Sequence, residues 1–430
     1  MTKQSTVLRG VRPYGEDVVD IVIRAGVISE IVKAGSGAGQ VIDAGELIAL
    51  PGFVDLHTHL REPGREDAET IETGSRAAAL GGFTAVFAMA NTSPVADTAG
   101  VVEQVWHLGQ ETGLVDVFPV GAVTVGLGGE QLAELGAMAT SAAQVRVFSD
   151  DGKCVHDAAI MRRALEYVKA FDGVIAQHAQ EPRLTVDAQM NEGLLSGQLG
   201  LTGWPGAAEE SIVARDVLLA EHVDSRLHVC HVSTAGSVEV IKWAKARGIK
   251  VTAEVTPHHL LLTEDLVATY DPVYKVNPPL RTSADVIALR AALAAGTIDA
   301  IATDHAPHPH EDKDCEWAAA AFGMLGLQTA FSIAVLTMIN SGLLDWRTLA
   351  DRLSVRPARI GHAVGHGHDL VVGAPANIAV VDPAASWVVE PATFASKSRN
   401  SPYSGMTLPG RVVHVFKSGE ASVTGGSTTC

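Results

Sequence analysis

Two histidines separated by one residue, His57 and His59, are the first residues in this sequence that could carry chemistry. They end an apolar run that begins near Ala49, and Arg61 follows two residues later. Side chains at i and i+2 of a β-strand point to the same face. Two imidazoles on one face, at the end of a strand, can share a metal ion. A single His-X-His is more often part of an ordinary surface strand, so the metal interpretation depends on the rest of the chain.

Four further apolar runs also end in histidine or aspartate. These ends are Ser149-Asp150-Asp151-Gly152, His178, His231 and Thr303-Asp304-His305. Each has an ordinary explanation, because a histidine can be hydrogen-bonded in a core and an aspartate can form a turn or cap a helix. Independent structural roles would not put all five groups at the ends of successive strands. Nitrogen and carboxylate ligands without thiolate suit Zn²⁺ or a similar divalent ion in an open, catalytic site.

The elements that must position these residues alternate between apolar runs and helical segments. The strand-like runs are Gly52–His57, Phe83–Met89, Val115–Val123, Gln144–Phe148, Val174–Ala176, Leu227–Cys230, Ile249–Val255 and Ala300–Ala302. Between them, Ala158–Phe171 has one apolar face and Asp157 as a candidate N-cap. In Ser237–Arg247 the apolar residues recur at a similar helical spacing. Near-continuous apolar strands that alternate with helices indicate a parallel sheet. Eight such units predict an α/β fold with a (β/α)8 barrel, which carries its reactive residues at the C-terminal ends of its strands.

The two ends of the chain have a different pattern. Residues 1–50 contain short strand-like runs separated by glycines. Three more strand-like stretches lie at Leu370–Gly373, Ala376–Asp382 and Val412–Phe416. We therefore expect residues 1–50 and 366–430 to join in one small β-sandwich beside a barrel formed by residues 51–365.

Composition excludes several classes of protein. The chain has 430 residues, of which 47% are hydrophobic and 19% charged, as in a globular protein with a large core. Its net charge of −17 argues against a general nucleic-acid surface and against anionic membranes. The first residues contain no apolar stretch of signal-peptide length, and no run is long enough to cross a membrane. The cysteines, Cys154, Cys230, Cys315 and Cys430, form no CxxC pair, so we expect a reduced, cytoplasmic protein.

The motifs together resemble those of the amidohydrolase superfamily, which has HxH after strand 1, histidines after strands 5 and 6, and an aspartate after strand 8. The fuller strings are similar to those of bacterial dihydroorotases of the long (class I), barrel-plus-sandwich type. They are HTHLREPG, MANTSP, FSDDG, EVTPHHL, VNPPLR and ATDHAPH. The resemblance is densest between Pro51 and about Gly326.

The resemblance implies a metal centre that holds one or two Zn²⁺ ions per subunit. The implied ligands are His57, His59 and Asp304 for the more buried ion, His178 and His231 for the second, and Asp151 as the bridge. Many relatives use a carboxylated lysine as this bridge. Here Asp151 takes its place and Lys153 follows two residues later, which leaves the number of metal ions open.

The resemblance also implies the substrate contacts. Arg61 and Asn91 would bind the carboxylate of the substrate beside His59, with His308 completing the pocket. The ring would contact Asn277 and the backbone of Phe322 and Gly323. From the residues alone, Arg61 could instead form a surface ion pair with Glu62 or Glu66, and both asparagines could be turn residues. The polar run from His308 to Trp317 suggests a mobile loop over the site.

The implied reaction is the reversible cyclisation of N-carbamoyl-L-aspartate to L-dihydroorotate in pyrimidine biosynthesis. In the ring-opening direction, a metal-activated hydroxide attacks the ring amide, and Asp304 acts as general base and then as general acid. One alternative is another cyclic-amide hydrolase, such as allantoinase or dihydropyrimidinase, which typically carries the bridging lysine. A second is a non-catalytic scaffold for aspartate transcarbamoylase, which should have lost ligands. The resemblance also suggests a homodimer and an association with that transcarbamoylase.

Overall fold

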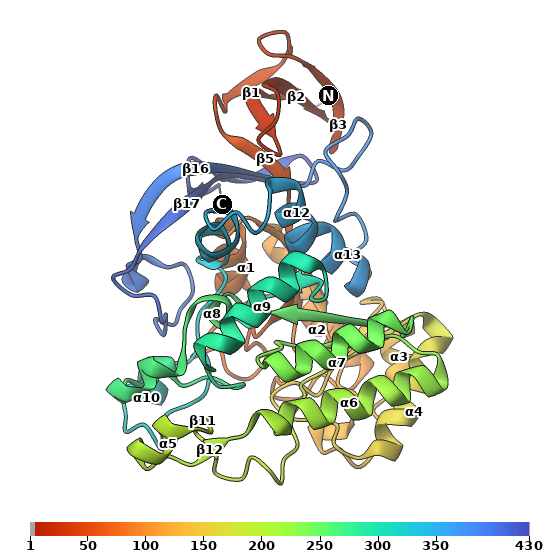
Figure 1. Cartoon of the computed structure of the whole chain (residues 1–430). Helices are drawn as coiled ribbons and strands as arrows, with labels where there is room; N and C mark the ends of the chain where they lie inside the picture. Colours follow the sequence, from red (N-terminus) through yellow and green to blue (C-terminus); the bar gives the residue numbers. More distant parts are fainter. Residues whose placement is uncertain (1–4, 430) are drawn as a thin grey trace.

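The computed structural model describes residues 5–429 of the chain. A sheet built from both chain ends lies at one end of the molecule, and helices and parallel strands form the remainder (Figure 1). Within the described residues, no helix is both long and apolar enough to cross a membrane. Cys154, Cys230 and Cys315 are free cysteines, whereas Cys430 lies outside the described residues.

Nine strands from the two chain ends form one sheet in the order β19-β18-β17-β16-β5-β1-β2-β3, with β4 paired to β1. The N-terminal strands are β1 (Thr6–Pro13), β2 (Val19–Arg24), β3 (Val27–Lys33), β4 (Gln40–Asp43) and β5 (Ile48–Pro51). The C-terminal strands are β16 (Ile378–Val388), β17 (Thr407–Lys417), β18 (Glu420–Thr424) and β19 (Ser427–Thr428). The two ends meet where β5 pairs antiparallel with β16, with Leu50 opposite Ala379, and both of these residues are fully buried. The prediction that the two chain ends join is therefore confirmed, and they do so in one sheet.

The strand predicted over Leu370–Gly373 is wrong, because this stretch forms a turn. Gly373 has φ +92°, a value that glycine adopts without steric cost, and its N–H donates to the carbonyl of Ile28. The turn brings Pro375 into a single antiparallel bridge with Val27. The short strands β18 and β19 are rich in Ser and Thr, and the apolar pattern of the sequence did not indicate them.

Eight parallel strands form two further sheets. The first contains β6 (Phe53–Thr58), β7 (Phe83–Ala88) and β8 (Asp116–Pro119), and the second contains β9 (Val147–Phe148), β10 (Val174–Gln177), β13 (Leu227–Val229), β14 (Val251–Val255) and β15 (Ala300–Ile301). Single parallel bridges join their edges, between Gly121 and Phe148 on one side and between Thr58 and His305 on the other. All eight predicted strands are present, and several are shorter than the apolar run that indicated them. The small pair β11 (Met190–Asn191) and β12 (Gly203–Trp204) lies apart from them.

Helices connect the strands and lie around them (Figure 1). They are α1 (Ile71–Leu80), α2 (Ala99–Thr112), α3 (Leu135–Thr140), α4 (Ala158–Val168), α5 (Leu194–Leu199), α6 (Gly206–Val223), α7 (Ala235–Ala246), α8 (Pro257–Leu261), α9 (Ser283–Ala295), α10 (His310–Lys313), α11 (Ala330–Ala334), α12 (Trp346–Ala350) and α13 (Arg356–Gly361). Short 3₁₀ segments occur at Val125–Leu127, Lys169–Phe171, Glu264–Thr269, Pro272–Tyr274 and Pro391–Thr393, and π-helical turns at Val335–Ile339 and Asp351–Val355. The predicted N-cap of α4 is confirmed, because the Asp157 carboxylate accepts from the N–H groups of Ala159 and Ile160.

An apolar core fills the space between the parallel strands. Val54, Leu56, Phe87 and Val147 belong to one buried cluster, to which α13 adds Ile360. Because apolar side chains fill this core, the polar residues collect past the C-terminal ends of the strands.

Candidate metal centre

His57 is the second-last residue of β6, and His59 follows the end of that strand. Their ring centroids lie 5.4 Å apart, as expected for side chains two positions apart on one face. The backbone N–H of His59 donates to the carbonyl of His305 at 2.8 Å, which fixes the first histidine pair against the segment after β15.

Asp55 connects this pair to Asp304. Its fully buried carboxylate accepts from the N–H of His57 at 3.1 Å, and from the N–H and hydroxyl of Thr303 at 3.0 and 2.6 Å. Asp304 follows Thr303 with φ +47°, a conformation that aspartate tolerates better than most residues. One carboxylate thus places the ends of two strands, and with them the side chains of His57 and Asp304.

Two carboxylates face the first histidine pair. Asp151 Oδ2 lies 3.3 Å from the Nε2 atoms of both His57 and His59. Asp304 Oδ1 lies 3.1 Å from His59 Nε2 and 3.5 Å from His57 Nε2. These four side chains form one half of a compact cluster.

The second half gathers around the other oxygen of Asp151. Its Oδ1 lies 3.3 Å from His178 Nδ1 and 3.2 Å from His231 Nε2, and these two nitrogens are 2.9 Å apart. Asp151 therefore turns one oxygen toward each histidine pair, which is the arrangement expected of a bridging ligand. All six predicted ligands meet in this cluster, and each is at most 5% exposed.

The cluster fits a divalent cation. Ligand atoms that surround a tetrahedral ion at about 2.0–2.2 Å lie roughly 3.3 Å from one another, close to most of the nitrogen–oxygen separations in the cluster. Among the described side chains, His57 Nε2 is a buried atom that has no hydrogen-bond partner, although two carboxylates face it. Imidazole and carboxylate are the donors that zinc and similar ions take in catalytic sites. The residues present thus suit one or two such ions.

The electrostatics of the cluster keep both carboxylates ionised. Burial alone would raise the pKa of Asp151, but the imidazoles of His57, His178 and His231 hold it well below its usual range. In the same way, His57 and His59 outweigh the effect of burial on Asp304, and the pKa of its carboxyl is strongly lowered. Metal ligands must be deprotonated, so carboxylates that stay ionised are suited to this role.

Arg61 lies beside the cluster and points toward the segment after β15. Its Nε donates to the carbonyl of Pro307 at 3.0 Å, and its Nη2 lies 3.3 Å from His308 Nε2. The alternative of a surface ion pair with Glu62 or Glu66 is wrong. Those carboxylates instead accept the backbone N–H groups of residues 71 and 64. Arg61 has φ +64°, so it does not continue the extended geometry of β6.

His308 joins Arg61 to the other predicted substrate residues. Its Nε2 lies 2.8 Å from the carbonyl of Phe322. A Cβ at Gly323 would lie 2.7 Å from that nitrogen, so the close approach at φ +145° requires glycine. Burial and the nearby Arg61 lower the pKa of His308, which keeps its imidazole neutral.

The two predicted asparagines contact the cluster through different histidines. Asn91 Oδ1 lies 2.8 Å from His59 Nδ1. Asn277 donates to Gln180 Oε1 at 3.2 Å, and the same oxygen lies 2.8 Å from His178 Nε2. Asn91 therefore contacts the cluster directly and Asn277 reaches it through Gln180. Arg61, His308, Phe322 and Gly323 form a connected group beside it.

Three residues of this region were not predicted: Asp55, Gln180 and Glu254. Asp55 and Glu254 are charged residues inside otherwise apolar strands, and this contrast was the available signal. Gln180 carried a weaker signal, since it follows His178 by two residues on a loop.

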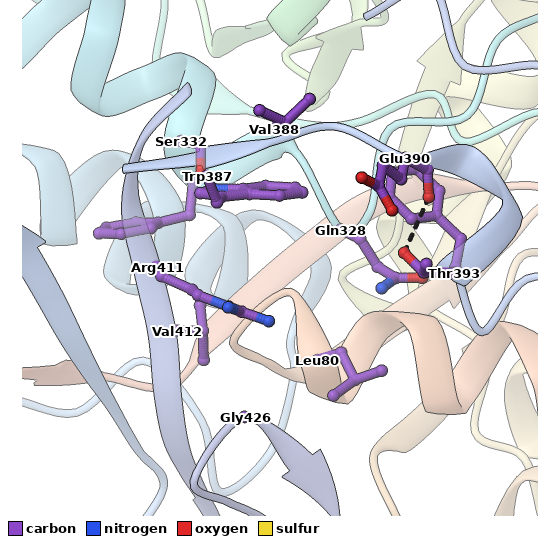
Figure 2. A pocket seen from close by; sticks show the side chains of 12 residues that line it. Leu80, Gln328, Ser332, Trp387, Val388, Glu390, Thr393, Arg411, Val412 and Gly426 are labelled. Carbon is purple, nitrogen blue, oxygen red and sulfur yellow. Dashed lines mark hydrogen bonds between the residues drawn. The ribbon is translucent and has the colours of Figure 1, made fainter. Parts of the chain in front are cut away.

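Two pockets are lined in part by residues next to the site, and another is lined by none of them. One of about 600 Å³ is lined by His308 and Lys313, and one of about 270 Å³ by Gly152 and Gln180. Figure 2 shows a third, of about 410 Å³, where Trp387 and Arg411 of the terminal sheet face α1 and α11. The lining of this third pocket in the described chain includes no predicted site residue, so the chemistry lies elsewhere.

Comparisons with known proteins find relatives that match nearly the whole chain. A family model described as "Dihydro-orotase-like" matches residues 45–237. The dihydroorotase of Streptomyces coelicolor is 66% identical over 425 residues, which cover 99% of each chain. That of Mycobacterium tuberculosis is 58% identical over 425 residues, covering 98% of this chain and 99% of the relative.

Solved structures share the fold. An L-hydantoinase (dihydropyrimidinase) from Arthrobacter aurescens superposes with a TM-score of 0.87 at 24% identity, over 100% of this chain and 98% of its own. A dihydropyrimidinase from Brevibacillus agri superposes with a TM-score of 0.85 at 22% identity, over 99% of this chain and 96% of its own. At this level of identity the likeness concerns the fold alone.

Proposed function

This chain belongs to the dihydroorotase family, and from this premise we propose that it catalyses the reversible cyclisation of N-carbamoyl-L-aspartate to L-dihydroorotate in pyrimidine biosynthesis. The observation that carries the proposal is the cluster of four histidines and two aspartates with Arg61 beside it. The scaffold alternative fits less well, because a protein that only supports a partner has no need of a complete ligand set.

The metal centre of this proposal holds one or two zinc ions. His57, His59 and Asp304 form one half, His178 and His231 the other, with Asp151 between them. A divalent ion bound there supplies a Lewis acid and lowers the pKa of water from about 15.7 toward roughly 7. The histidines act as neutral ligands, and the two carboxylates balance the charge.

Asp304 carries the proton in this proposal. During ring opening, water adds to the ring carbonyl carbon and the bond between that carbon and the ring nitrogen breaks. Asp304 accepts the proton of the attacking water and passes it to the departing nitrogen. Cyclisation is the reverse, so the same carboxylate first accepts the proton of the attacking nitrogen and then donates it to the departing oxygen, which leaves as water. No serine or cysteine nucleophile is needed.

Arg61 selects the substrate in this proposal. A guanidinium presents two parallel donors that match a carboxylate, and dihydroorotate carries a carboxylate that allantoin and dihydrouracil lack. Asn91 and His308 complete the carboxylate pocket beside His59, and Asn277 with the backbone of residues 322 and 323 contacts the ring. This choice of substrate favours dihydroorotase over the other cyclic-amide hydrolases.

We also infer that the eight parallel strands close into one barrel over residues 51–365. Bridges at both edges of the two parallel sheets support this closure. Residues 1–50 and 366–430 would then form a separate β-sandwich, and the pairing of β5 with β16 supports that division.

A side-by-side assay tests the function. We expect the metal-loaded protein to open dihydroorotate and to leave allantoin and dihydrouracil nearly untouched, with metal analysis giving one or two zinc ions per chain. Removal of the metal by a chelator should abolish turnover, and added Zn²⁺ should restore it. Preferential hydrolysis of allantoin or dihydrouracil would contradict the proposal.

Replacement of Arg61 by alanine is expected to weaken substrate binding. A charge-assisted hydrogen bond contributes about 1.5–3 kcal/mol, so KM for dihydroorotate should rise roughly 10- to 100-fold, with a smaller change in kcat. Arg162→Ala is a suitable control, because Arg162 forms an exposed ion pair with Glu166 on α4. An unchanged KM in Arg61→Ala would remove Arg61 from the carboxylate pocket.

A further inference from the structure

Glu254 on β14 joins two buried histidines. Its Oε1 lies 2.8 Å from His57 Nδ1, and its Oε2 lies 3.0 Å from His228 Nε2. On the far side, His228 Nδ1 lies 2.9 Å from the hydroxyl of Thr252. Glu254 is 1% exposed and His228 is 2% exposed, so water does not compete for these contacts. His228 therefore faces the interior.

These contacts fix the tautomer of a neutral His57. An ionised carboxylate only accepts hydrogen bonds, so His57 Nδ1 must carry the hydrogen and donate it to Glu254. Its Nε2 then has a free lone pair, and this is the buried atom that faces Asp151 and Asp304 without a hydrogen-bond partner in the described chain. A metal ligand needs such a nitrogen, and a carboxylate on the opposite nitrogen also makes it more basic.

Glu254 does not itself fit the geometry of a metal ligand. His57, Cys230 and Glu254 form a group whose potential ligand atoms lie within 4.8 Å of one another. However, both carboxylate oxygens of Glu254 already contact imidazole nitrogens. An ion held there by His57 and Glu254 would have to take His57 Nδ1, the nitrogen that already lies at hydrogen-bond distance, 2.8 Å, from Glu254 Oε1.

The corresponding partners of His59 and His178 are neutral. His59 Nδ1 faces the amide oxygen of Asn91, and His178 Nε2 faces that of Gln180. Among these three histidines, His57 alone is oriented by a carboxylate, which is itself held by a further imidazole.

We propose that Glu254 is a positioning residue that sets His57 as an Nε2 ligand of the metal centre, and that His228 and Thr252 hold Glu254 in place. The inference rests on the proposed metal-dependent function and adds a residue that acts through His57 without touching the substrate. Outer partners of this kind typically change metal affinity 10- to 100-fold when they are replaced.

Two variants of Glu254 separate its charge from its hydrogen bond. Glu254→Leu removes both at similar volume. Glu254→Gln keeps an oxygen that accepts from His57, while its amide N–H can donate to His228 once that imidazole moves its proton to Nδ1. Asp299→Asn is the matched control, because Asp299 is another buried carboxylate, bonded to Lys245 and the N–H of Ala253 and outside the metal cluster.

The test is a Co²⁺ titration of the metal-free, full-length proteins, followed by visible absorption, with thermal unfolding measured in parallel. Glu254→Leu should bind the first equivalent of Co²⁺ about 10- to 100-fold more weakly than the wild type. Glu254→Gln should show a smaller loss of Co²⁺ affinity. Both should alter the cobalt absorption band, whereas Asp299→Asn should keep the wild-type affinity and band.

Wild-type affinity in both Glu254 variants would overturn the proposal, as would an equal loss in Asp299→Asn. If Glu254→Leu does not fold, Glu254→Gln decides alone, since a weaker affinity with a changed band supports the proposal and unchanged values refute it. The titration needs no substrate. A wild-type protein that binds Co²⁺ without opening dihydroorotate would contradict the proposed function and leave the role of Glu254 standing.

Discussion

Asp304→Asn is expected to abolish turnover while leaving the fold intact. Asparagine has nearly the same shape and tolerates the same left-handed backbone, so φ +47° at this position remains accessible. Its amide accepts no proton, and it is a poorer metal ligand than a carboxylate. General acid–base catalysis alone contributes about 10²- to 10⁴-fold, so kcat should fall by at least this factor. Steady-state ring opening and the thermal unfolding curve measure the two parts of the prediction.

Asp172→Asn is the control for this substitution. Asp172 also has a left-handed backbone, with φ +52°, and it follows the 3₁₀ turn Lys169–Phe171 at the surface. Its variant should show wild-type turnover. Metal analysis of Asp304→Asn separates two causes of inactivity, because a variant that keeps its metal has lost the proton carrier. Near-wild-type kcat in Asp304→Asn would remove Asp304 from the proton-transfer role.

The presence of the parallel strands could be predicted because each lies in a mainly apolar run. Burial on both faces favours this pattern. The prediction failed at Leu370–Gly373, where the same apolar composition forms a turn. The turn at this place is held by the hydrogen bond between Gly373 and Ile28, which lie 345 positions apart in the sequence. Local composition carries no information about such a partner.

The ligands could be predicted because parallel strands bring their C-terminal ends to one place. His178 and Asp151 are far from His57 in sequence, and topology alone makes them neighbours. Arg61 follows His59 by two residues but does not continue the strand. The strand β6 ends at Thr58, and the left-handed backbone of Arg61 directs its guanidinium to Pro307.

The residues that orient the ligands could not be predicted in the same way. A charge inside an apolar strand shows that some partner exists, but its identity depends on the register of neighbouring strands. Glu254 meets His57 across 197 residues of sequence, and Asp55 meets Thr303 across 248. The chemistry of the centre can thus be read from the strand ends, whereas its geometry requires the folded structure.

Replacement of Asp151 is the second substitution for which we expect a very large effect. Asp151 contacts all four histidines of the cluster, two through each of its carboxylate oxygens. In Asp151→Asn, one of those oxygens becomes an NH₂ group, which cannot coordinate a cation. We therefore expect the metal content to fall to at most one ion per chain, and kcat to fall by at least about 10²-fold because one half of the cluster loses its anionic ligand.

Lys153→Ala is the informative control, because many relatives bridge their metals with a carboxylated lysine. In this chain Lys153 is exposed, whereas Asp151 is buried among the imidazoles. Lys153→Ala should therefore keep the metal content and turnover of the wild type, while Asp151→Asn loses both. The opposite pattern would assign the bridge to Lys153. If both variants retain two ions and full activity, the two histidine pairs bind their ions independently and the cluster has no bridging ligand.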